Sequence, residues 1–197
     1  MKSKLILSAM VAGALLLNSC SKGVTEETKT AMATFEAAWA EAGTMANNWG
    51  ADLATQYSKT KEHVDHQTAM MTESMPKMKD ETMKSKLMEL DNNDKANLTA
   101  LETMKNDWTK FQTDWEKNTA DYTAWKEKVE KGEVNNTEAT AALTEWNTKL
   151  DNAKNTLNTW NTAYATTKAK SEADMAACDA AMSTPASTTP PAKTTKK

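Results

Sequence analysis

The sequence predicts an all-α fold in which three long segments form an elongated antiparallel helical bundle. Helix-breaking residues are sparse, because 197 residues contain only five Gly and four Pro, and few of these interrupt residues 25–182. Within that stretch the apolar side chains recur at alternating steps of three and four residues, which is the spacing of helices that pack against helices. We therefore expect a single helical bundle over residues 25–182.

The apolar pattern divides the bundle into helices over about 25–72, 76–131 and 137–182. Lys, Glu, Asp, Asn and Thr occupy the intervening positions, as a solvated helix face requires. The seven Trp fall on the apolar runs, so we interpret them as core residues rather than as a platform for carbohydrate or lipid. The three runs are Met32, Phe35, Trp39, Ala42, Ala46, Trp49, Leu53 and Tyr57; Leu101, Met104, Trp108, Phe111, Trp115, Tyr122, Trp125 and Val129; and Ala139, Leu143, Trp146, Leu150, Ala153, Leu157, Trp160 and Tyr164.

Two turns separate the expected helices. Gly132 suits the end of the second helix, and Asn136 or Thr137 could cap the start of the third. The first turn has two candidate positions. Pro76 would break a helix interior, whereas a break at Asp91–Asp94 would leave a short additional helix over about 76–90. The length of the third helix favours the turn near Pro76. The far end of the third helix packs beside Leu87 and Leu90, so the second helix must already include these residues.

Folding the helices back across these turns predicts which side chains share a layer. The second and third helices pair Trp125 with Leu143 and bring Cys178 and Met182 beside Leu90 and Leu87. Folding the first helix back across residues 72–76 completes the layers, in an arrangement similar to the spectrin repeat in architecture. The expected layers are Trp39, Trp108 and Trp160; Phe35, Phe111 and Leu157; and Met32, Trp115 and Ala153.

The first 19 residues predict a secretory signal peptide. Lys2 and Lys4 precede the apolar run Leu5–Leu17, which is shorter than the roughly 20 residues of a membrane-spanning helix. The run ends in Leu17-Asn-Ser-Cys20, which resembles the lipobox of bacterial lipoproteins. That resemblance implies diacylglycerol on the Cys20 thiol, cleavage before Cys20 and an N-acyl chain such as palmitate on the new terminus. Residues 20–24 would then be a lipidated linker, and Ser21 favours the outer membrane of the cell envelope.

The last residues differ sharply in composition from the bundle. Residues 183–197 are rich in Thr, Pro and Lys, so we expect a disordered tail. An acylated start, a helical rod and a terminal Lys197 are similar in layout to the murein lipoprotein, which links the outer membrane to peptidoglycan. An envelope-to-peptidoglycan tether is therefore one alternative function.

His63, His66 and Met70 form the strongest cluster of potential metal ligands. Steps of three and four residues place all three on one helical face. Imidazole and thioether ligands suit copper, especially copper(I), in an exported protein. A periplasmic copper-binding protein is therefore a second alternative. The competing interpretation is two solvent-exposed His beside Met residues that fill packing gaps.

Several function classes lack their usual signals. The chain has a net charge of −3 and no Arg, so it shows neither the basic face nor the guanidinium groups typical of nucleic-acid binding. Phosphate-binding Gly loops, nucleophile elbows and His-centred triads are also missing, and we do not expect an enzyme or a cofactor. Cys178 has no second Cys beside it in the sequence, and we interpret it as a buried helix residue.

One internal segment resembles a known group of proteins. Met71-Thr-Glu-Ser-Met-Pro-Lys-Met78, followed by Lys84, Lys86 and Leu87, is similar to a stretch of small Bacteroidetes-type helical lipoproteins that are often labelled "viral A-type inclusion protein". The resemblance covers about 20 residues and implies no defined chemistry. We therefore expect a non-enzymatic, membrane-anchored envelope lipoprotein that acts as a helical spacer or interaction scaffold, with an unknown protein or peptidoglycan partner.

Overall fold

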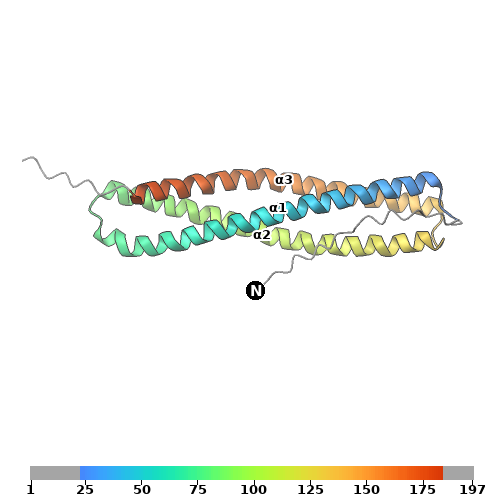
Figure 1. Ribbon diagram of the computed structural model, residues 1–197, viewed down its shortest axis with the longest axis horizontal. Helices are drawn as coiled ribbons and strands as arrows, with labels where there is room; N and C mark the ends of the chain where they lie inside the picture. The colour runs from blue at the N-terminus through green and yellow to red at the C-terminus, as the bar shows by residue number, and fades with distance from the viewer. Residues whose placement is uncertain (1–22, 184–197) are drawn as a thin grey trace, which may run out of the picture.

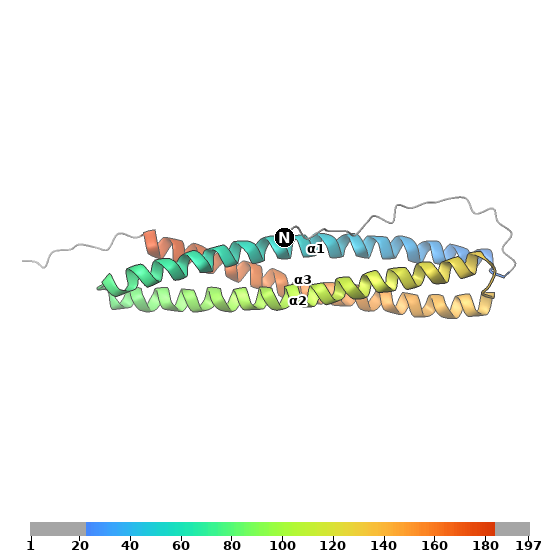
Figure 2. The same ribbon diagram turned by 90° about the horizontal axis from the view of Figure 1, so that it is seen from below.

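The computed structural model describes residues 23–183 and confirms the all-α bundle. Three long helices, α1 (Glu26–Ser74), α2 (Glu81–Glu130) and α3 (Asn136–Ser183), lie side by side along one axis (Figure 1). α1 and α3 run in the same direction and α2 runs opposite to both, as the two perpendicular views show (Figure 2). Helices of this length form a rod of about 70 Å, at 1.5 Å per residue.

Each helix begins at a polar cap. The Thr25 side chain accepts a hydrogen bond from the Thr28 amide at the start of α1, and Asp80 accepts from the amides of Thr82 and Met83 at the start of α2. α3 begins with a reciprocal capping box. In it the Glu138 amide donates to the Asn135 side chain at 3.0 Å, and the Asn135 amide donates to the Glu138 carboxylate at 3.1 Å. The cap of α3 is therefore Asn135, whereas the sequence suggested Asn136 or Thr137.

The first turn lies at Pro76 rather than at Asp91–Asp94. A short 3₁₀ helix, η1 (Met75–Lys77), follows α1 directly, and α2 starts at Glu81. The segment Asp91–Asp94 lies within α2, where Asp91 and Asp94 are buried. The second turn contains Gly132, whose φ of 72° is readily available only to glycine.

The core consists of three clusters along the rod. The α2–α3 pairing agrees with the expected register, because Trp125 and Leu143 share the first cluster and Trp108 and Trp160 share the second. The third cluster lies near the end of α3, and its buried members are Leu87, Leu90, Cys178 and Ala181.

The predicted register of α1 is wrong by two to three helical turns. Trp39 stacks on Trp115, with ring centroids 3.9 Å apart, instead of meeting Trp108. Trp108 instead contacts Trp49, which also stacks on Trp160. The layer of Trp39, Trp108 and Trp160 therefore does not form. One reason is that α1 continues to Ser74 and the turn occupies residues 75–80, which moves the reversal point further along the chain.

Two glycines of α1 fix the observed register. A Cβ added at Gly50 would lie 2.5 Å from the indole of Trp108, and one at Gly43 would lie 3.4 Å from the indole of Trp115. Each indole therefore packs directly over a stretch of bare helix backbone. The two Gly and the two Trp are each seven residues apart, so both pairs form together when the helices have this offset.

Candidate functional site

The predicted lipid-attachment residue, Cys20, lies outside the described residues, as do the signal peptide and residues 184–197. Within residues 23–183, none of the helices combines the length and the apolar character needed to cross a bilayer. The described residue nearest to Cys20 with a structural role is Val24, which is buried in the first core cluster.

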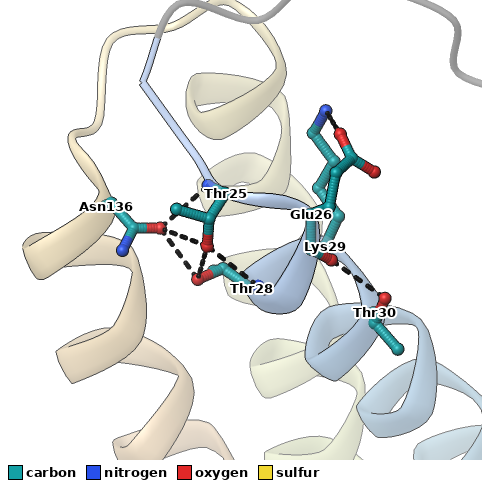
Figure 3. A network of polar contacts seen from close by, with 6 residues as sticks. All are labelled: Thr25, Glu26, Thr28, Lys29, Thr30 and Asn136. Atoms are coloured by element: carbon teal, nitrogen blue, oxygen red, sulfur yellow. Dashed lines mark hydrogen bonds and ion pairs between the residues drawn. The ribbon is translucent and has the colours of Figure 1, made fainter.

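The start of α1 is joined to the start of α3 by one side chain. The Asn136 carboxamide oxygen accepts hydrogen bonds from the Thr25 amide at 2.9 Å, the Thr25 hydroxyl at 3.1 Å and the Thr28 hydroxyl at 2.8 Å (Figure 3). These three donors come from the first turn of α1 and its cap. The bundle is therefore closed only five residues after Cys20.

The three residues that the sequence grouped as copper ligands differ in their exposure. His63 points into the bundle, where its Nδ1 lies 3.2 Å from Asp94 of α2 and its Nε2 lies 3.4 Å from Asp179 of α3. His66 and Met70 are exposed on α1. Within the described part of the chain, no group of three or more His, Cys, Asp or Glu side chains is arranged to hold a metal ion.

His63 belongs to a polar cluster that spans all three helices and is largely buried apart from Asp179, whose side chain is 67% exposed. Thr60 and Ser171 form a hydrogen bond of 2.7 Å between their hydroxyls, and the Asn97 amide donates to Asp174 at 2.9 Å. We call this set the polar cluster, and it replaces apolar core over several turns of the rod. Its members are Gln56, Thr60, His63 and Gln67 of α1, Asp91, Asp94 and Asn97 of α2, and Ser171, Asp174 and Asp179 of α3.

Asp94 is the most perturbed acid in this cluster. Its side chain is fully buried, and its carboxyl pKa is raised to about 6, mainly by this burial. The nearby charges of Asp174 and Asp91 also contribute to the raised pKa, whereas His63 acts in the opposite direction. Asp94 and His63 are within ion-pair distance, yet the buried nitrogens of His63 and oxygens of Asp94 have no partner in hydrogen-bond geometry.

Cys178 lies in the third core cluster and is completely buried. The pKa of its thiol is raised to about 11, mainly by burial and to a smaller extent by the nearby Asp94 carboxylate. A thiol with a raised pKa stays protonated at neutral pH and is a poor nucleophile. This placement fits the interpretation of Cys178 as a packing residue.

A shallow hollow between α1 and α3 contains one ionisable acid, Asp52. Its carboxylate accepts hydrogen bonds from the Lys168 ammonium at 2.9 Å and from the Tyr164 hydroxyl at 2.8 Å. The bond from Lys168, followed by that from Tyr164, lowers the pKa of Asp52. Asp52 therefore serves as an ionised partner that links α1 to α3, not as a proton donor.

Sequence reasoning found His63 but missed both of its partners. Asp94 and Asp179 lie on other helices, and the expected α1 register would not have brought Asp94 opposite His63. A signal was nevertheless present, because Asp91, Asp94 and Asn97 occupy inward positions between Leu90 and Leu101. No family model, curated protein or solved structure matches this chain.

Proposed function

We propose that the chain is a non-enzymatic lipoprotein of the bacterial cell envelope that acts as a helical spacer or interaction scaffold. Cys20 would carry the lipid, and the outer membrane would be the anchoring surface. The lipobox-like sequence Leu17–Cys20 supports the anchor. The elongated bundle supports the spacer, because a rod of about 70 Å displays its far end well beyond the lipid headgroups.

The observation that carries the proposal is the short distance along the chain between Cys20 and the closed end of the bundle. Thr25, which is held by Asn136, lies five positions after Cys20. A fully extended chain spans at most about 3.6 Å per residue, so this linker reaches less than about 20 Å. A lipid on Cys20 would therefore keep the loop between α2 and α3 close to the membrane, with the Pro76 turn at the far end.

Metabolic labelling with an alkyne analogue of palmitate tests the anchor. Wild-type protein should incorporate the label and sediment with membranes, because acyl chains on Cys20 partition into the bilayer. Cys20→Ser should lose both the label and the sedimentation. Cys178→Ser is the matched control and should keep both. Labelling that persists in Cys20→Ser would refute this anchor.

Removal of residues 184–197 tests the scaffold. This truncation leaves α3 intact, since the helix extends through Ser183. We expect the truncated protein to keep its helical circular dichroism and its unfolding midpoint but to lose crosslinks to envelope partners or to the wall. An unchanged crosslinking pattern would show that the tail has no part in association.

A further inference from the structure

The two halves of the rod are held together by different chemistry. The first two core clusters contain side chains from all three helices and include every Trp of the chain. We call residues 24–57 and 101–164 the aromatic half. Beyond it, the third cluster draws its buried residues only from α2 and α3, and the partly buried residues packed against it include none from α1.

The inward face of α1 changes character at the boundary between these halves. After Leu53 its buried residues are Gln56, Thr60, Val64 and Gln67, of which only Val64 is apolar. The last part of α1 therefore buries little apolar surface against its neighbours. Because apolar burial is the main term that holds a helix in a bundle, this segment is attached less firmly than the aromatic half.

The polar groups of this segment compensate poorly for the missing apolar contacts. Gln67 is completely buried, and neither its amide nitrogen nor its oxygen has a hydrogen-bond partner. His63 faces Asp94 and Asp179 without meeting hydrogen-bond geometry. Exposure to water would satisfy all of these groups, and a buried unsatisfied group costs roughly 1–3 kcal/mol.

We propose that residues 61–80 form an arm that opens away from α2 and α3 while the aromatic half stays folded. The arm comprises the end of α1 and the turn, and it is connected to the rod at both of its ends. Opening is therefore a local unfolding of the arm, of the kind that separates weakly packed segments from a stable core. It hydrates His63 and Gln67. It also withdraws Met78, which packs against the third core cluster, and so uncovers Cys178, which is fully buried in the closed state.

Two reporters in different halves of the molecule test this proposal. In the full chain carrying Cys20→Ser, Cys178 is the sole thiol, and all seven Trp lie in the aromatic half. We expect iodoacetamide to label Cys178 at urea concentrations where Trp fluorescence still reports a folded protein. Labelling of Cys178 that follows the same urea dependence as Trp fluorescence would overturn the proposal.

Gln67→Leu provides the decisive variant. Replacing an unsatisfied buried amide by an apolar side chain of similar size should slow Cys178 labelling by roughly tenfold or more. The urea midpoint of Trp fluorescence should stay the same, since the arm is already open at that midpoint. Ala69→Leu, at an exposed position of the same arm, is the matched control and should leave the labelling rate unchanged.

Hydrogen exchange on the parent chain gives a test that is independent of any core substitution. Backbone amides of residues 61–74 should exchange faster than those of residues 32–53, although both segments belong to one continuous helix. Equal protection of the two segments would overturn the proposal even if Gln67→Leu failed to fold.

Discussion

At the scale of single residues, the bundle contains two residues of types that are normally unfavourable at their positions. Asp94 is a fully buried carboxyl in the polar cluster, and Gly50 is a glycine in a helix interior. Each is explained by its neighbours. Asp94 lies beside His63, and Gly50 leaves the space that the Trp108 indole fills. Both arrangements predict measurable effects of substitution.

Asp94→Asn should stabilise the protein at neutral pH. The pKa of Asp94 is raised in the folded protein, from its ordinary value of 3.8 to about 6, so folding favours the protonated carboxyl. Its favourable contribution is complete below pH 3.8 and is lost as the pH rises to about 6. At pH 7.5 the variant should gain on the order of 2 kcal/mol in free energy of unfolding. Urea denaturation should show a smaller gain at pH 4, and an equal gain at both pH values would contradict this assignment.

Gly50→Ala should destabilise the bundle although alanine favours helices. The new methyl group would lie 2.5 Å from the rigid Trp108 indole. Overpacking costs about 1–3 kcal/mol, and the gain in helix propensity offsets at most about 1 kcal/mol. Gly43→Ala is the matched comparison, because its methyl group would meet Trp115 at 3.4 Å. Thermal unfolding should show a lower Tm for Gly50→Ala than for the parent protein. The Tm of Gly43→Ala should be unchanged or slightly higher.

At the scale of the helices, the sequence is informative where a short, well-marked turn sets the register. Gly132 and the polar residues after it define the turn from α2 to α3, and the pairing of those helices followed from it. The register of α1 did not follow, because Pro76 marks a turn without revealing how many residues it uses. Apolar periodicity also does not predict the packing of Trp108 over Gly50, because Gly contributes no side chain to the pattern.

Asn136→Ala should loosen the junction between α1 and α3. The substitution removes the common acceptor of three hydrogen bonds, two of them from Thr25 and one from Thr28. We expect a loss of about 1 kcal/mol, typical of a lost cap, together with faster amide exchange in the first turn of α1. Asn135→Ala is a useful comparison, because it removes the α3 cap but leaves the Asn136 junction in place. If amide exchange in Asn136→Ala became faster only in α3, Asn136 would not hold the start of α1 against α3.

At the scale of the whole molecule, the rod combines the firmly packed aromatic half with the weakly packed arm, residues 61–80, which contains the Pro76 turn. The aromatic half begins at Val24, close to the proposed anchor, and the Pro76 turn lies at the opposite end (Figure 1). The aromatic half therefore provides most of the stability, and the proposed opening of the arm takes place at the opposite end of the bundle. The proposed spacer would benefit from this division, because the end next to the proposed lipid anchor would stay rigid.

Trp108→Ala tests how strongly the aromatic half supports the rod. Trp108 is buried in the second core cluster beside Trp49 and Phe111. Truncation of a large buried aromatic side chain costs about 3–5 kcal/mol. Chemical denaturation followed by circular dichroism should show a loss of that size. A loss below about 1 kcal/mol would show that Trp108 does not occupy a central core position.

Nuclear Overhauser contacts between assigned indole rings would show whether the three helices pack in the register set by Trp108 over Gly50 and Trp115 over Gly43. We expect a strong contact between Trp39 and Trp115, whose ring centroids are 3.9 Å apart, and contacts of Trp49 with Trp108 and Trp160. A contact between Trp39 and Trp108, without one between Trp39 and Trp115, would contradict this register.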